Sequence, residues 1–174
     1  MPQNTARLKG MNADLETFYG LTIRTRSHVL EWLETLPVDV FNAQREDFAY
    51  GSLNAIYTHV ADCYLHWVGA VGLSELNSER TPGNIAELRD YFKSVDQIVS
   101  RAINSFEDWD EPLVYTSSSG RTEMLTRRWL ILHPITHEFH HKGQALALAR
   151  VLGHPHPGQP DSDLVTPGDP PLSN

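Results

Sequence analysis

The sequence predicts an all-α protein: a four-helix bundle followed by an extended, proline-rich C-terminal tail. Three observations favour this class. Apolar residues recur at helical spacing in four segments, most connections between these segments are short, and prolines concentrate after the fourth segment. The length of 174 residues suits one domain, so we expect residues 1–174 to form a single domain without internal repeats.

The first helix is expected at about residues 13–36. Pro37 should end it, because proline disfavours the helical conformation in the residue before it. The second helix is expected at about residues 52–72. Ser52 is a suitable N-cap, since its hydroxyl can accept from a free backbone N–H, and Gly72 can end the helix in a left-handed conformation.

The third helix is expected at about residues 84–108, where Asn84 and Glu87 have the spacing of a capping box. The fourth is expected at about residues 124–152. Pro134 lies inside this segment and should either kink the helix or mark its true start.

Two segments outside the helices have their own patterns. Residues 113–116, between the third and fourth helices, have the composition of a short hairpin strand. The tail, residues 153–174, has six prolines from His154 onward and should be extended. Leu164 and Val165 are the apolar residues that could attach this tail to the helices.

Composition excludes several function classes. Asp plus Glu total 22 and Lys plus Arg total 14, so the formal net charge of −8 argues against nucleic acid and anionic membranes as partners. Cys63 is the single cysteine, which excludes an intramolecular disulfide and favours a reducing compartment. The first residues do not resemble a signal peptide, and no apolar run approaches the ~18 residues of a membrane span. We therefore expect a soluble, cytoplasmic protein.

Histidine is unusually frequent, with nine in the chain and five of them between positions 133 and 154. His137 and His141 are spaced i, i+4, which places both imidazoles on one helix face about 6 Å apart along the axis. His59 is the best third metal ligand, because Ala55 and Cys63 leave room for it one turn to either side. The alternative for His59 alone is a hydrogen-bonded core histidine, which is the commoner role of a lone histidine on an apolar helix.

The same residues allow a second interpretation. Residues 137–141 read His-Glu-Phe-His-His, which fits the zinc-peptidase pattern with Glu138 as general base. Extended forms of that pattern have a histidine six positions further on, where this chain has Ala147. The peptidase interpretation is therefore the weaker one.

Neighbouring side chains have alternative roles as well. Glu138 is either a hydrogen-bond partner of the centre or a surface charge, and we favour the surface. Cys63 could be a fourth ligand, although a small buried apolar residue is the preferred interpretation. His133 either lines the pocket or packs at the expected kink. Three histidines leave a zinc ion at least one open coordination position, which is typical of a catalytic site.

Several segments resemble the DinB/YfiT-like family. The most specific is the run Thr136-His-Glu-Phe-His-His-Lys-Gly-Gln144, which resembles the signature near the end of these proteins. Residues 52–59 resemble the start of the family's second helix, which leads to its first metal histidine, and Trp67 resembles a tryptophan that often follows. Gly153-His-Pro, together with residues 161–164, resembles the closing segment.

The resemblance implies a four-helix bundle of up-down-down-up order, often homodimeric, with His59, His137 and His141 holding one divalent metal ion. Zinc or nickel is favoured, and iron is a third choice. The implied function is a metal-dependent transferase or hydrolase acting on a small molecule, in some relatives with a low-molecular-weight thiol as cosubstrate. The alternatives are a non-catalytic metal-binding or stress-response protein and, as the weakest, the metallopeptidase.

Overall fold

The structure is a computed structural model that describes residues 2–76, 78–158 and 164–165. It is mostly helical, which confirms the predicted class in its broad form. The helices are α1 (Pro2–Glu34), α2 (Val38–Phe41), α3 (Leu53–Tyr64), the π-helix η1 (Leu65–Gly72), α4 (Ile85–Ser105) and α5 (Arg127–Val151), and the strands are β1 (Pro112–Thr116) and β2 (Thr122–Thr126).

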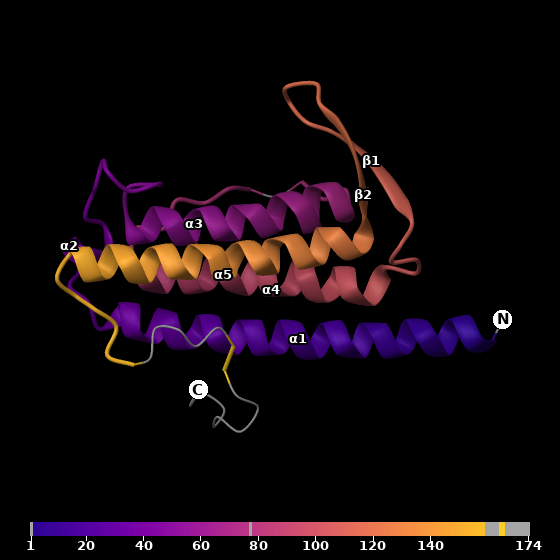
Figure 1. Ribbon diagram of the computed structural model, residues 1–174, viewed down its shortest axis with the longest axis horizontal. Coiled ribbons are helices and arrows are strands. Elements are labelled where there is room, and N and C mark those ends of the chain that lie inside the picture. Colours follow the sequence, from indigo (N-terminus) through magenta and orange to yellow (C-terminus); the bar gives the residue numbers. More distant parts are fainter. Residues whose placement is uncertain (1, 77, 159–163, 166–174) are drawn as a thin grey trace.

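Four long helical segments lie side by side with nearly aligned axes (Figure 1). They are α1, α3 continued by η1, α4, and α5. The helices α1 and α5 run in one direction, and α3 with η1 and α4 run in the other (Figure 1). Close contacts join α3 to both α5 and α4, and α1 to α4.

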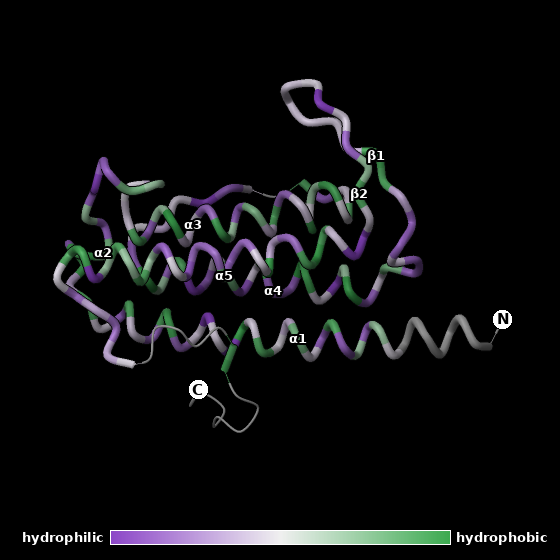
Figure 2. Tube along the Cα trace, viewed as in Figure 1, coloured by the Kyte–Doolittle hydropathy of each residue, from purple (hydrophilic) through white to green (hydrophobic). Residues whose placement is uncertain are grey.

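The core forms where the apolar faces of these helices meet. Hydrophilic and hydrophobic residues alternate along each helix at short intervals, as expected for helices with one buried face (Figure 2). Leu53, Leu88, Ile131 and Leu148, taken from α3, α4 and α5, are completely buried. Each such side chain contributes about 1.5–3 kcal/mol through its removal from water.

Two predicted helix starts are confirmed by their caps. The Ser52 hydroxyl accepts from the backbone N–H of Ala55 at 3.1 Å, and the Asn84 side chain accepts from that of Glu87 at 3.0 Å. The expectation for Gly72 was wrong, because its φ is not positive. An added Cβ there would lie 3.1 Å from the Phe106 ring, so close packing explains the glycine.

Three other boundaries differ from the predictions. The first helix begins at Pro2 rather than near residue 13. Proline is compatible with the first helical position, because it loses no helical hydrogen bond there. The short α2 was not predicted. The fourth long helix begins at Arg127, capped by Thr126, because residues 122–126 pair as a strand. It continues through Pro134, so Pro134 does not mark its start.

The β1–β2 hairpin confirms the strand predicted at residues 113–116. Its antiparallel register pairs Leu113 with Leu125 and Tyr115 with Glu123. The hairpin extends away from the helices, and its turn is mostly hydrophilic (Figures 1 and 2).

The described part of the tail contains no helix or strand. The His156 ring packs against Trp32, and the backbone N–H of Val165 donates to the Thr25 hydroxyl on α1 at 3.1 Å, so the tail is attached at Val165 through its backbone. Residues 161–163 of the family-like closing segment lie outside the described residues. Within the part of the chain that the structure describes, no helix is long and apolar enough to cross a membrane.

Candidate metal centre

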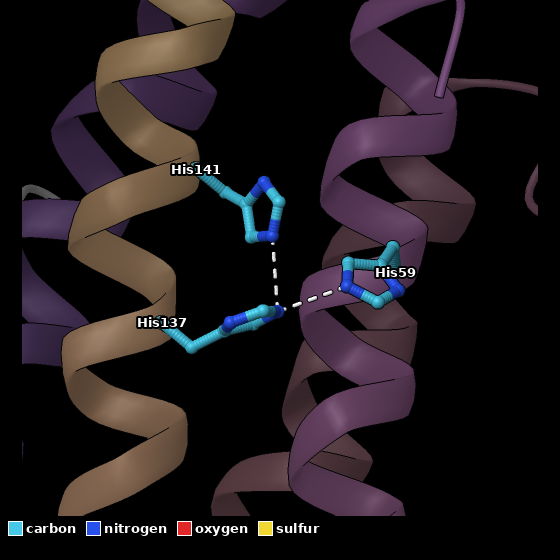
Figure 3. A group of neighbouring side chains, drawn as sticks. All are labelled: His59, His137 and His141. Carbon is cyan, nitrogen blue, oxygen red and sulfur yellow. Dashed lines mark hydrogen bonds between the residues drawn. The ribbon is translucent and has the colours of Figure 1, made fainter. Parts of the chain in front are cut away.

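The three predicted histidines meet between α3 and α5 (Figure 3). The Nε2 atom of His137 lies 2.9 Å from Nε2 of His59 and 3.0 Å from Nε2 of His141. His59 and His137 are half-buried, whereas His141 is buried. The three Nε2 atoms therefore converge on one point at the edge of the core, and this group could hold a metal ion.

Gln144 fixes the orientation of the His141 ring. Its Oε1 lies 2.7 Å from Nδ1 of His141. A carbonyl oxygen can only accept, so Nδ1 carries the proton and Nε2 of a neutral His141 presents its lone pair to the centre. Such a partner on the outer nitrogen is the usual way in which proteins orient a metal-binding imidazole.

Hydrogen bonds among the three rings cannot pair all of the nitrogens that face one another. A neutral His137 has at most one proton on Nε2, which can donate linearly to only one of its two neighbours. A divalent cation would accept all three lone pairs. Two nitrogens bound to one tetrahedral zinc ion lie about 3.3 Å apart, given metal–nitrogen distances of 2.0–2.1 Å. The observed spacings are a few tenths of an ångström shorter, so the donor set fits such an ion.

The protonation states also suit metal binding. Burial lowers the pKa of His137 to about 4, helped by repulsion from the neighbouring His141 and His59. Burial likewise lowers the pKa of His59 and of His141. All three histidines are therefore neutral near pH 7, which is the form that binds metal ions.

Glu138 is neither on the surface, as favoured from the sequence, nor placed as a general base. The residue is 4 % exposed, and its Oε1 accepts from Nε of Arg26 on α1 at 2.8 Å. Its Oε2 accepts from the hydroxyl of Tyr64 at 2.8 Å. Since a carboxylate one position after His137 points about 100° around the helix, it reaches the core between α1, α3 and α5 instead of the histidines.

Cys63 and His133 lie beside the centre without joining it. Their ligand atoms form a second group with His137, in which all three lie within 4.8 Å of one another. Among the described residues, no group combines Cys63 with all three histidines. Burial raises the pKa of the Cys63 thiol to about 12, so without a metal it stays protonated, which agrees with the preferred interpretation as a buried apolar residue.

An aromatic row extends from the centre along α5 toward the hairpin. His133 stacks on Trp129 with ring centroids 4.3 Å apart, and on His137 at 5.6 Å. Trp67 from η1 packs edge-on against Trp129, and Tyr115 from β1 packs against Trp67. His133 thus lines the surroundings of the centre, which is one of its two predicted roles.

Tyr50 belongs to the site and was missed from the sequence. Its hydroxyl lies 2.9 Å from Nε2 of His59, and its ring stacks on the His59 ring at 4.2 Å. Tyr50 lies in the connection before α3, where neither helical spacing nor a motif identifies a site residue. The only local signal is Gly51, which marks a turn close to the start of the histidine-bearing helix.

The remaining histidines play no part in the centre. His66 is exposed and contacts the Tyr115 hydroxyl at 3.1 Å. His140 is exposed and contacts the Gln144 amide nitrogen at 3.1 Å. His28 is also exposed.

Comparison with known proteins identifies the family. The model of the DinB family matches residues 1–162, which is nearly the whole chain. The chain therefore belongs to the DinB family, as its histidine-pair signature indicated. No curated protein matches it significantly.

Proposed function

We propose that this protein is a metal-dependent enzyme that acts on a small molecule as a transferase or hydrolase, with a low-molecular-weight thiol as the first cosubstrate to test. The observation that carries the proposal is the convergence of three Nε2 atoms at the half-exposed edge of the core, where His59 meets His137 across 78 positions of sequence and His141 joins them. Membership of the DinB family supports it.

In this proposal His59, His137 and His141 hold one divalent ion, with zinc or nickel preferred to iron. Imidazole ligands suit all three metals. The bound ion would supply a Lewis acid and would stabilise the anionic form of a water or thiol. The protein's own contribution is to keep the ligands neutral through burial and to orient His141 through Gln144.

We also propose the architecture and setting that the family suggests. The four long helical segments would be a four-helix bundle of up-down-down-up order, and residues 1–174 would form a single domain. The protein would be a cytoplasmic homodimer whose ligands are small molecules and not nucleic acid or membranes. The directions of the helices in Figure 1 support the up-down-down-up order, and the net charge of −8 argues against nucleic acid and anionic membranes as partners.

A second candidate is a non-catalytic metal-binding protein. The second group, Cys63, His133 and His137, favours it, because it places the Cys63 sulfur within 4.8 Å of the His137 ligand atom, and a thiolate ligand would close the coordination sphere. Cobalt substitution separates the candidates: a thiolate charge-transfer band indicates a closed site, and its absence indicates an open one. The metallopeptidase is not proposed, since both carboxylate oxygens of Glu138 are engaged in the core.

The decisive experiment is metal analysis of protein purified without an affinity tag. We expect about one metal ion per chain in the natural protein, and loss of that ion in both His59→Ala and His137→Ala. His28→Ala, which changes an exposed histidine on α1, is the matched control and should keep the metal. Metal retained in the His59 variant, or absent from the natural protein, contradicts the shared site. Screening of small thiols and hydrolysable esters follows a positive result.

A further inference from the structure

We propose that Tyr50 is a further catalytic residue, whose hydroxyl donates a hydrogen bond to an anionic atom of the substrate bound at the open position of the metal centre. This inference rests on the proposed function, because it requires a metal ion on the three histidines. It adds a residue to the site and restricts the ligand to one that binds through an anionic atom, such as a thiolate sulfur or a carboxylate oxygen.

The position of the Tyr50 side chain carries the first step. Its hydroxyl lies 2.9 Å from Nε2 of His59, the same atom that faces His137. Its ring is stacked on His59 with an interplanar angle of 21° and meets His141 edge-on at 5.2 Å. Tyr50 therefore covers two of the three ligands and directs its only polar atom at the point where their nitrogens meet.

The turn that contains Tyr50 holds its backbone in an unusual conformation. Tyr50 has a φ of 65°, in the left-handed region that bulky residues rarely adopt, and Gly51 follows with a φ of 75°. Hydrogen bonds hold the turn: the N–H of Arg45 donates to the Gly51 carbonyl at 2.7 Å, and that of Gly51 donates to the Phe48 carbonyl at 3.1 Å. Such backbone conformations in non-glycine residues cluster at functional sites.

The exposure of the Tyr50 side chain shows that it does not pack in the hydrophobic core. Tyr50 is 46 % exposed, whereas Tyr57 and Tyr64 on α3 are at most 1 % exposed. A half-exposed tyrosine over a ligand pair lies on the side from which a small molecule reaches the centre. The site thus combines metal ligands on the core side with a polar contact on the solvent side.

The three neutral histidine ligands determine which hydrogen bond the Tyr50 hydroxyl can make once a metal ion is bound. Once Nε2 of His59 binds a metal ion, its lone pair is used and it can no longer accept from Tyr50. Three neutral imidazoles leave the dipositive charge of the ion uncompensated, so the centre favours an anion at its open position. The Tyr50 hydroxyl is then a donor next to an anionic acceptor, and hydrogen bonds to charged groups are stronger than neutral ones.

The test measures the binding of two probes to the cobalt-substituted protein. Binding is monitored through the change in the visible absorption spectrum of the cobalt ion. Azide binds as an anion whose bound nitrogen can accept a hydrogen bond, whereas imidazole binds through its only free lone pair and offers the hydroxyl no acceptor. Tyr50→Phe removes the hydroxyl and keeps the ring. Tyr57→Phe is the matched control, because its hydroxyl is buried and has no hydrogen-bond partner within the described residues.

We expect Tyr50→Phe to bind one cobalt ion per chain, to bind azide roughly 10- to 100-fold more weakly, and to bind imidazole as the natural protein does. Unchanged or tighter azide binding overturns the inference, and so does loss of cobalt, which would make Tyr50 a ligand. An equal weakening for both probes overturns it too, because it indicates a structural effect. Failure of the natural protein to bind cobalt contradicts the proposed function itself.

Discussion

Nε of Arg26 on α1 lies 2.8 Å from Oε1 of Glu138 on α5, although 112 positions separate the two residues. The pair is buried, with both side chains at most 6 % exposed. Asp96 on α4 accepts from the same guanidinium at 2.7 Å, and Tyr64 on α3 donates to Glu138. One polar network thus connects the four long helices directly beside His137, and it fixes which face of α5 points toward His59.

Removing the cation of this network should destabilise the protein strongly. In Arg26→Met, Glu138 and Asp96 are left without their buried partner, and breaking a buried ion pair typically costs about 3–5 kcal/mol. Glu138→Gln should cost less, because Arg26 keeps Asp96. Urea unfolding of both variants measures the two changes. Arg45→Met, in the exposed pair with Asp47, is the control and should unfold as the natural protein does.

Loss of the Gln144 side chain should weaken metal binding without unfolding the protein. In Gln144→Leu, Nδ1 of His141 loses its partner at 2.7 Å, so the ring and its tautomer are no longer fixed. Loss of such a partner typically lowers metal affinity about 10- to 100-fold. Competition with a coloured chelator measures the affinity. Gln97→Leu, at an exposed position of α4, should leave it unchanged, and equal affinities in the two variants would show that Gln144 has no orienting role.

Metal binding should stabilise the folded state, because the centre exists only when α3 and α5 are packed together. At a free metal concentration about 1,000 times Kd, the gain is about 4 kcal/mol, which corresponds to a rise in Tm of roughly 8–16 °C for a chain of this size. Thermal unfolding with zinc and with a chelator measures this rise. It should vanish in His137→Ala and persist in His28→Ala. A rise that survives in the His137 variant would place the bound metal elsewhere.

The metal-free protein should lose stability as the pH falls below the ordinary pKa of histidine. Histidine in the unfolded chain has a pKa near 6.5, whereas burial lowers that of folded His137 to about 4. Between these values the unfolded state binds more protons, so the free energy of unfolding decreases with falling pH. His59 and His141 shift in the same direction.

Urea unfolding in the presence of a chelator at several pH values between 7.5 and 4.5 checks this dependence. Replacing His137 with asparagine removes one contributing group, so the decline should become shallower. An identical decline in His137→Asn would assign the pH dependence to other groups.

Local signals were sufficient for several predictions. Ser52 and Asn84 cap their helices as predicted, because the interaction of a cap with the following turn depends only on neighbouring residues. Two other local signals had mixed outcomes: Pro134 lies inside its helix, which was one of its two predicted roles, and the prediction for Gly72 was wrong. α5 continues through Pro134, and Gly72 is needed for packing against Phe106 rather than for its backbone conformation. At Gly72 a tertiary contact, rather than the local backbone preference, explains the residue.

The sequence by itself determined the helical class, the family signature and the His137–His141 pair, because periodicity and i, i+4 spacing are properties of one helix. His59 was predicted from its small neighbours Ala55 and Cys63 and from the family resemblance, and the packing of α3 on α5 brings it to the pair. It assigned Glu138 to the surface, since position on an isolated helix does not reveal that Arg26 arrives from α1. Only the tertiary structure decided the burial of that pair and the placement of Tyr50 on His59, because both depend on how separate segments meet. Spacing along one helix specifies which side chains share a face, but the packing of other elements decides what that face contacts.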